Sequence, residues 1–314
     1  MVEVYHRCIF LTIIRIMFSS GIYHVLTTDK RRENSRHTYS GFCRRCMSFP
    51  NAPTVQFVLL HDIVVSYIIR PRLITFDVTG TLLMTKLEDY VEIGSQHGLP
   101  LDRRKLARSF KNSFHRLSLE HPVYGKHTGI GWENWWRQLV HSVFKDQHNY
   151  ISDATLDKVA NSLIRCYGTS MCWHKYPGTI ELLDYLRKKE LILGIISNFD
   201  ERLEAILEDT KIRSYFSFVL TSYDFGVEKP DTLIFDEALR LTKKRHSINI
   251  SPQQAIHIGD SVDNDYIGAK DAKWNAILIQ HDNDGNQKEI PAEDVFRNLR
   301  DLRVHLSTLL DEVM

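Results

Sequence analysis

The sequence predicts an α/β protein with a Rossmann-like, doubly wound parallel sheet and an inserted group of helices. Two patterns from residue 71 onward carry this prediction. Short apolar, β-branched runs alternate with segments of helical periodicity, which is typical of parallel strands connected by helices. About a hundred residues without a strand-like run separate the first two strands, far more than an ordinary strand-to-helix connection needs.

Five strands are expected, because five short apolar runs are bounded by polar or turn-forming residues. Their bounds are residues 73–77, 191–197, 218–221, 255–259 and 276–279. Helices are expected at 179–189 and 202–209, and another begins at Pro230, where proline suits a first helical turn. In open sheets of this kind, ligands bind beyond the carboxyl ends of the strands.

The long segment 88–174 is expected to form several amphipathic helices and a domain of its own. It follows directly after the end of the first strand, on the side where ligands enter. We therefore expect a helical cap over the binding site. The sheet domain would then consist of residues 71–87 and 175–314.

The composition is that of a soluble globular protein, with 43% hydrophobic and 25% charged residues. With a formal net charge of only +1, the chain has no overall electrostatic attraction for nucleic acid or an anionic membrane surface, and neither is expected as a partner. No apolar stretch of about eighteen residues is free of charged side chains, so no transmembrane helix is expected. Five cysteines, an odd and sparse set, are not typical of a disulfide framework. These features favour the cytoplasm or the nucleus.

Residues 1–70 differ from the rest of the chain and are interpreted as a poorly ordered N-terminal extension. An apolar stretch from 8 to 26 is interrupted by Arg15, and a basic run follows from 27 to 45. Richness in arginine and serine with few acids is also typical of mitochondrial presequences, so mitochondrial import is the alternative. Cys43 and Cys46 are interpreted as incidental thiols, because a structural zinc site needs four ligands.

Polar residues suited to a binding site lie at or just after the ends of the expected strands. Asp77 ends the first strand, Ser197 ends the second, and Lys229 lies in the loop after the third. Asp260 and Asp265 follow the fourth strand. Asp77 and Asp260 would share one edge of the sheet, where two carboxylates repel unless a cation lies between them. Mg²⁺, which prefers oxygen ligands, suits that position.

This set of groups is suited to phosphoryl transfer. A carboxylate such as Asp77 can attack phosphorus and form an aspartyl-phosphate, which water then hydrolyses. Lys229 would neutralise charge on the transferring group, and the Ser197 hydroxyl would orient one of its oxygens. Asp265 would either touch the metal through water or hold Lys229. Thr81 is expected to orient Asp77 by a hydrogen bond.

The order of these signals resembles the signatures of the haloacid dehalogenase-like hydrolase superfamily over residues 71–281. Three further segments fit this pattern: 177–178, 197–200 and 226–231. Tyr124-Gly125 and Trp135-Trp136 make the chain most similar to the haloacid dehalogenase-like hydrolase domain-containing protein 3 group. The resemblance implies a small phosphorylated metabolite as substrate.

The resemblance also implies roles for particular residues. Mg²⁺ would bind Asp77, the carbonyl of Thr79 and Asp260, with Asp265 supporting the metal site. Asn198, next to Ser197, is placed among the substrate-binding groups.

Thr79 departs from the family pattern. Phosphatases of this family carry a second aspartate two residues after the nucleophile, which protonates the leaving group and later activates water. A threonine hydroxyl cannot replace it near neutral pH, and losing such a group costs about 10²–10⁴ in rate. Residues 77–81 instead resemble the phosphorylation loop of P-type ATPases, although the chain has no expected membrane spans.

Three functions therefore stay open, of which a slow or specialised Mg²⁺-dependent phosphatase is favoured. Its proton donor would come from the cap or from the substrate. The second is a catalytically silent relative that binds a phosphorylated ligand or a protein partner. The third is a dehalogenase, against which Asp260 argues, because that chemistry needs no metal carboxylate.

A few further residues are assigned roles by their positions. Tyr124, His127 and Trp132 lie in or beside a glycine-containing loop that could bend over the site, and His127 is a candidate proton donor and substrate contact. Trp135 and Trp136 are expected to pack in the helical core. His257, inside a strand, is expected to be a core residue, and Glu228 is expected to belong to a charged loop face.

Overall fold

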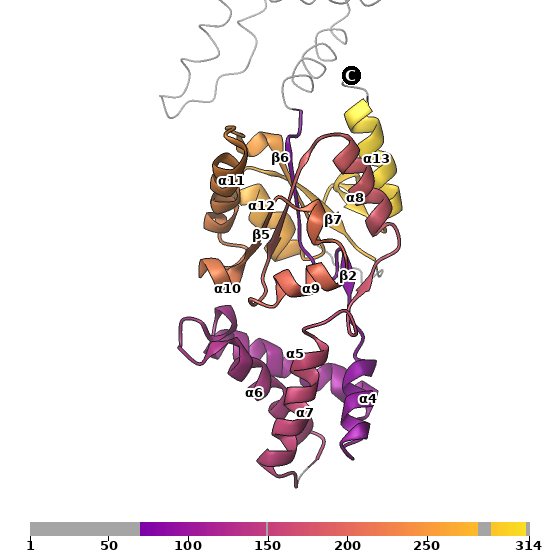
Figure 1. Cartoon of the computed structure of the whole chain (residues 1–314), viewed down its shortest axis with the longest axis vertical. Helices are drawn as coiled ribbons and strands as arrows, with labels where there is room; N and C mark the ends of the chain where they lie inside the picture. Colours follow the sequence, from indigo (N-terminus) through magenta and orange to yellow (C-terminus); the bar gives the residue numbers. More distant parts are fainter. Residues whose placement is uncertain (1–69, 149, 282–289, 312–314) are drawn as a thin grey trace, which may run out of the picture. The chain divides into compact units, whose positions relative to one another are not determined.

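The computed structural model describes residues 70–148, 150–281 and 290–311 of the 314-residue chain (Figure 1). The predictions for the N-terminal extension, its targeting role and the Cys43–Cys46 pair therefore lie outside the described residues, save for residue 70. Among the helices that are described, none is both long and apolar enough to cross a membrane.

A six-stranded parallel sheet forms the centre of the fold, with the strand order β5-β4-β1-β6-β7-β8. The strands are β1 (Leu73–Phe76), β4 (Ile192–Ser197), β5 (Phe218–Thr221), β6 (Ala255–Gly259), β7 (Asn275–Ile279) and β8 (Val295–Phe296). The order runs outward from β1 in both directions, which confirms the doubly wound sheet. The expected number of five strands is wrong, because the two-residue β8 is too short to give a sequence pattern.

The two faces of the sheet are covered by different helices (Figure 1). One face packs against α8 (Thr179–Lys188), α9 (Leu203–Asp209) and α13 (Leu299–Asp311), and the other packs against α11 (Thr232–His246) and α12 (Gly268–Asp271). Along β1, Ile74 and Phe76 belong to the first core while Leu73 belongs to the second, as the alternation of a strand requires.

Helix α11 begins two residues later than expected. The Asp231 side chain accepts a hydrogen bond from the amide of Leu233 at 2.9 Å, so Asp231 is the cap and Thr232 the first helical residue. Pro230 lies before the cap. A short helix, α10 (Ser222–Phe225), was not expected and follows β5 directly.

Four α-helices are described between β2 (Leu83–Met84) and β3 (His174–Lys175), two short strands that pair antiparallel and were not predicted. The helices are α4 (Glu88–Gln96), α5 (Arg103–Glu120), α6 (Gly131–Lys145) and α7 (Asp153–Cys166). Their apolar faces form a separate core that includes Leu106, Leu117, Leu139 and Phe144. We call residues 88–174 the helical insert.

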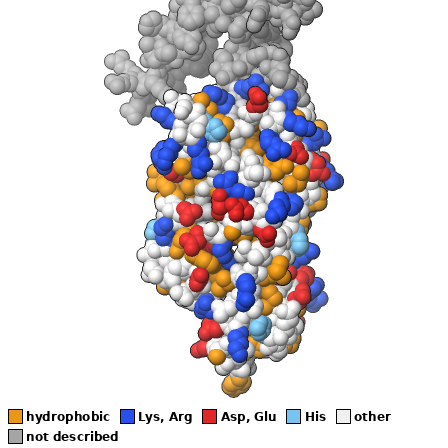
Figure 2. Space-filling model, in the orientation of Figure 1, with side chains coloured by type: hydrophobic (Ala, Val, Ile, Leu, Met, Phe, Trp, Pro, Cys, Tyr) orange, Lys and Arg blue, Asp and Glu red, His pale blue; other side chains and the backbone are white. Residues whose placement is uncertain are grey.

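Cys166 and Cys172 form a disulfide between the end of α7 and the segment before β3. This bond was not expected, because an odd and sparse set of cysteines is not typical of a disulfide framework. An odd total count does not reveal that two of the five lie six residues apart on either side of a turn. Figure 2 shows side chains of both charges mixed over the visible face, in keeping with the small net charge.

Candidate active site

The expected acidic and basic residues meet at the carboxyl edge of the sheet. Asp77 follows β1, Ser197 is the last residue of β4, and Asp260 follows β6. Lys229 reaches them from the loop after α10, and Asp265 from η4 (Val262–Ile267), a π-helical turn. All five line one cavity of about 680 Å³.

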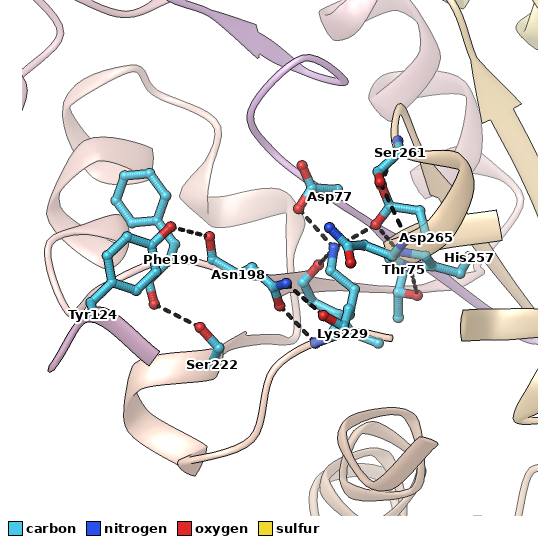
Figure 3. A network of polar contacts seen from close by, with 12 residues as sticks. Thr75, Asp77, Tyr124, Asn198, Phe199, Ser222, Lys229, His257, Ser261 and Asp265 are labelled. Atoms are coloured by element: carbon cyan, nitrogen blue, oxygen red, sulfur yellow. Dashed lines mark hydrogen bonds and ion pairs between the residues drawn. The ribbon is translucent and has the colours of Figure 1, made fainter. Parts of the chain in front are cut away.

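Lys229 is the centre of a buried network (Figure 3). Its Nζ donates to Asp77 Oδ1 at 2.8 Å, to Asp265 Oδ1 at 2.6 Å and to the carbonyl oxygen of Ile196 at 2.8 Å. An ammonium group has three N–H donors, so each one has an acceptor here. The residue is 3% exposed. Its position is therefore fixed by the protein before any ligand binds.

Asp265 continues the network into the sheet. Its Oδ2 accepts from the amide of Ser261 at 2.9 Å, and its Oδ1 lies 3.0 Å from His257 Nε2. His257 Nδ1 is 2.8 Å from Thr75 Oγ1, its partner across the β1–β6 ladder. Of the two alternatives in the sequence analysis, holding Lys229 is therefore the one that this geometry favours for Asp265.

His257 is buried, as expected, but it belongs to this polar network and not only to the apolar core. Burial lowers its pKa most strongly, and the charge of Lys229 lowers it further, against the opposing bond to Asp265. A neutral ring fits the contacts, with Nε2–H donating to Asp265 and Nδ1 accepting from the Thr75 hydroxyl. Sequence reasoning missed this link; its signal was a pair of polar residues inside two apolar strands.

The charges of the network shift one another's pKa. Burial would lower the pKa of Lys229, but Asp265 and Asp77 outweigh it and raise the pKa. Burial raises the pKa of Asp77, and Asp265 adds to this while Lys229 opposes it. Burial would also raise the pKa of Asp265, yet Lys229 and His257 hold it well below the usual range. Lys229 and Asp265 therefore both stay charged.

Asp260 is the acid without a cationic partner in this set. Oxygens of Asp77, Asp260 and Asp265 lie within 4.8 Å of one another. The Asp260 side chain keeps some contact with solvent. Loss of water around its carboxyl group nevertheless raises its pKa to about 8, and the charges of Asp77 and Asp265 add to this rise. Since Lys229 is engaged by the other two acids, a divalent cation is the partner that this cluster fits.

Gly80 brings the nucleophile loop close to Asp260. Its φ is +79°, and a Cβ placed on it would collide with the Asp260 carboxylate. Only glycine suits both the conformation and the approach. Thr79, expected to offer its carbonyl to the metal, lines the same cavity.

Thr81 does not make the expected hydrogen bond to Asp77. Its hydroxyl is buried and has no hydrogen-bond partner among the described residues. The Val78 carbonyl accepts from the amides of Thr81, Leu82 and Leu83, and this tight turn holds the Thr81 side chain apart from the carboxylate. Ser197 instead bonds to Asp77 and favours its charged form.

Asn198 fixes the lysine loop. Its Nδ2 donates to the carbonyl of Lys229 and its Oδ1 accepts from the amide of Lys229, both at 2.8 Å (Figure 3). The Tyr124 hydroxyl of the insert donates to the Asn198 carbonyl at 2.8 Å. The Asn198 amide group is thus engaged by protein, although the residue also lines the cavity.

His127 is not brought to the site. Its Nε2 lies 2.8 Å from the carbonyl oxygen of Gly226, the ring is exposed, and the residue is not among those that line the cavity. The structure thus does not place His127 beside Asp77, because the ring binds a core loop at the surface. Lys126 does the same, donating to the carbonyls of Tyr223 and Asp224. The glycine-containing loop does reach the core, as expected, through these contacts.

Two lining residues were assigned other roles from the sequence. Trp135 is packed in the insert as expected and borders the cavity while buried. Trp136, also expected in the core, is only partly buried, lines the cavity and donates from Nε1 to Asp200 Oδ2 at 2.7 Å. Glu228, expected to be part of a charged loop face, also lines the cavity. Burial raises the pKa of its carboxyl group, against the opposing effects of His127 and of the Val123 backbone.

A parallel sheet with acids at its strand ends and a buried lysine beside them is an α/β protein whose ligand site lies at the carboxyl edge of the sheet. A family model described as haloacid dehalogenase-like hydrolase matches residues 71–273. The chain belongs to the haloacid dehalogenase-like hydrolase family.

Curated relatives support the same placement. The chain is 39% identical over 219 residues to the rhythmically expressed gene 2 protein of Drosophila melanogaster, covering 67% of this chain and 83% of that one. It is 34% identical over 247 residues to haloacid dehalogenase-like hydrolase domain-containing protein 3 of Xenopus laevis, covering 77% and 98%. The narrower resemblance noted in the sequence is thereby confirmed.

Solved structures show the same fold. A Bacillus subtilis protein named YfnB, described as a HAD-hydrolase and solved bound to magnesium, superposes with a TM-score of 0.58 at 18% identity, covering 77% of this chain and 99% of that one. L-2-haloacid dehalogenase from Xanthobacter autotrophicus, with chloropropionic acid covalently bound, gives 0.56 at 14% identity, covering 75% and 98%. At these identities the likeness concerns the fold alone.

Proposed function

We propose that this chain is a Mg²⁺-dependent phosphatase that acts through an aspartyl-phosphate at Asp77. The observation that carries the proposal is the meeting of three carboxyl groups within 4.8 Å, with the Lys229 ammonium 2.8 Å from Asp77. Asp77 and Asp260 would hold the ion together with the Thr79 carbonyl, since both Asp265 oxygens are engaged by protein groups. Bound Mg²⁺ supplies positive charge that stabilises the transferring phosphoryl group.

The residues divide the chemistry among themselves. Lys229 holds Oδ1 of Asp77, which leaves Oδ2 to attack phosphorus. The bond from Asp77 to phosphorus forms as the bond from phosphorus to the leaving oxygen breaks. Water then attacks the same phosphorus, releasing phosphate and restoring the Asp77 carboxylate. Lys229 and Ser197 stabilise the charge on the phosphoryl oxygens during both steps.

The proton for the leaving group cannot come from Thr79. Besides the proposed metal ligand Asp260, Glu228 is a carboxyl group on the cavity wall that makes no bond to Lys229, and burial raises its pKa, a direction that favours proton donation. We assign the donor role to it in place of His127. The insert, in this proposal, is the cap that closes over the substrate and excludes water.

The test is phosphate release from a panel of phosphate monoesters, with and without Mg²⁺, using Asp77→Asn as the blank. We expect release that depends on Mg²⁺ and falls by about 10⁴-fold or more in the variant, because a lost nucleophile removes the covalent route. Equal release by the variant would eliminate Asp77 as the nucleophile.

Thr79 favours a second candidate, a catalytically silent relative that binds a phosphorylated ligand. In that case, Mg²⁺ and phosphate analogues would bind to the parent protein while every ester in the panel stays intact. A dehalogenase is the least supported candidate, since Asp260 has no role in that chemistry.

A further inference from the structure

The end of the cavity that the insert forms is apolar. Apart from Ser118, every lining residue that the described part of the insert contributes has an aliphatic or aromatic side chain. Eight aromatic residues of the insert line this wall: Tyr90, Phe110, Phe114, Tyr124, Trp135, Trp136, Tyr167 and Trp173. A ligand that extends from Asp77 into this space meets ring faces and edges.

The polar atoms on those rings are mostly engaged elsewhere. The Trp136 indole donates to Asp200, and the Tyr124 hydroxyl donates to the Asn198 carbonyl. The hydroxyl of Tyr167 donates to the Lys86 carbonyl at 3.1 Å, and the indole of Trp173 donates to the Tyr167 carbonyl at 3.0 Å. Few hydrogen-bond partners are left for a polar ligand at this end.

The rings pack with one another and still leave room. Phe114 and Trp136 lie 6.2 Å apart between centroids, and Tyr124 stacks on Trp136 at 5.9 Å, yet Phe114 and Trp136 are only partly buried. The whole cavity, about 680 Å³, has the volume of a small-molecule site. An apolar void of this kind accepts apolar ligands readily.

The position of the phosphoryl group determines what enters this space. With phosphorus at Asp77, the rest of the substrate extends toward the insert. The hydroxyl groups of a sugar or polyol would lose their hydrogen bonds to water there without gaining hydrogen bonds to the protein, which weakens binding strongly. A flat apolar ring would gain offset-stacked or edge contacts with the aromatic wall.

The chemistry at position 79 agrees with such a leaving group. A phenol ionises with a pKa of about 10, as tyrosine does. Water, which stands here for an alkyl alcohol, ionises with a pKa of about 15.7. An aryl oxygen can therefore depart with its electron pair and take its proton later. The loss of an acid at Thr79 matters much less for an aryl ester than for an alkyl ester.

We propose that the substrate is an aryl phosphate, or a phosphate ester with a similarly flat apolar group, seated against the Phe114–Trp136 wall. This inference rests on the proposed function and specifies its substrate class. The bond from phosphorus to the aryl oxygen breaks as Asp77 binds phosphorus, and the aryl group leaves from the insert end of the cavity.

Binding measurements on the full chain test this without requiring turnover. Titration calorimetry in Mg²⁺ compares 2-naphthylmethylphosphonate with 3,4-dihydroxybutylphosphonate, and 2-naphthol is titrated separately. We expect the naphthyl phosphonate to bind at least about tenfold more tightly than the polar one, because ring contacts and apolar burial favour it. Equal or tighter binding of the dihydroxybutyl compound would overturn the proposal.

Ser118→Leu fills the apolar end and should weaken naphthyl binding by about tenfold while leaving the dihydroxybutyl compound unchanged. Asn112→Leu, on the exposed side of the same helix, is the matched control and should change neither. Binding of 2-naphthol without either phosphonate would support the aromatic site and count against the phosphoryl site. Failure of all three ligands to bind would remove the aromatic site.

Discussion

At the sheet edge, Lys229 donates to three acceptors within 2.8 Å, whereas the rings of the insert meet at centroid distances of 5.1 to 6.3 Å. Lys229 and Asp265 each have several fixed partners at the sheet edge, and removing one leaves the others buried without compensation. Ring packing in the insert is less directional and tolerates changes that keep the volume. In the proposed function, the sheet edge therefore determines the reaction, and the insert end of the cavity determines the shape of the substrate.

The largest effect is expected from Lys229→Met, which breaks the sheet-edge network. Two buried carboxylates lose their cation, so the free energy of unfolding should fall by about 3–5 kcal/mol and turnover should be lost. Denaturant unfolding in the absence of Mg²⁺ measures this. Lys270→Met is the matched control, because Lys270 is 42% exposed and its pair with Asp294 is worth less than about 1 kcal/mol. Similar losses in both variants would mean that the buried network contributes no more to stability than an exposed ion pair.

Thr79→Asp should raise the turnover of an alkyl phosphate by about 10²–10⁴, because it supplies a carboxylic acid beside the nucleophile. The gain should be much smaller for an aryl phosphate, whose oxygen leaves without a proton. Thr79→Asn has nearly the same shape without the acid and should give no gain. A Thr79→Asp enzyme slower than its parent would mean that another group already transfers the proton at full efficiency.

Glu228 and His127 differ in their relation to the cavity, and the same substitution compares them. Glu228→Gln should slow an alkyl phosphate by about 10², since the donor is removed. His127→Gln should leave the rate unchanged, because the ring binds the Gly226 carbonyl at the surface. Steady-state rates with an alkyl ester measure both. The opposite ranking would return His127 to the role that the sequence first suggested.

The smallest effect expected is on the pH dependence of Mg²⁺ affinity. Because the pKa of Asp260 is raised to about 8, the carboxyl is protonated below that pH in the metal-free protein. Mg²⁺ must displace this proton, so affinity should rise by up to about tenfold per pH unit toward pH 8 and then level off. Calorimetry at several pH values measures this, and Asp263→Asn, an exposed neighbour, is the control. An affinity independent of pH from 6 to 8 would contradict the assignment.

The sheet edge could be predicted from the sequence because each of its groups follows a strand. Parallel strands bring their carboxyl ends to one edge, so the order of Asp77, Ser197, Lys229 and Asp260 along the chain was sufficient to group them. The roles of Thr81 and His257 were not accessible in this way. The first depends on the path of a tight turn, and the second on which residues face each other across two strands.

The aromatic wall could not be predicted, because a helix with an apolar face has the same sequence pattern whether its rings fill a core or border a void. Trp135 and Trp136 are neighbours in α6 and both border the cavity, yet Trp135 is 1% exposed while Trp136 is only partly buried. Only the packing of α5, α6 and α7 together distinguishes them. The disulfide and β8 could not be predicted either. The first depends on how the turn after α7 brings Cys172 back to Cys166, and the second is a strand of only two residues.

Gly80 and Gly259 each lie very close to the carboxylate of an acidic residue further along the chain. A methyl group on Gly80 would displace the Asp260 carboxylate, and one on Gly259 would displace Asp265. A single carbon atom added at either position would therefore alter the chemistry without touching any reactive residue. Attempts to stabilise this protein by replacing glycines with alanine should exclude both positions.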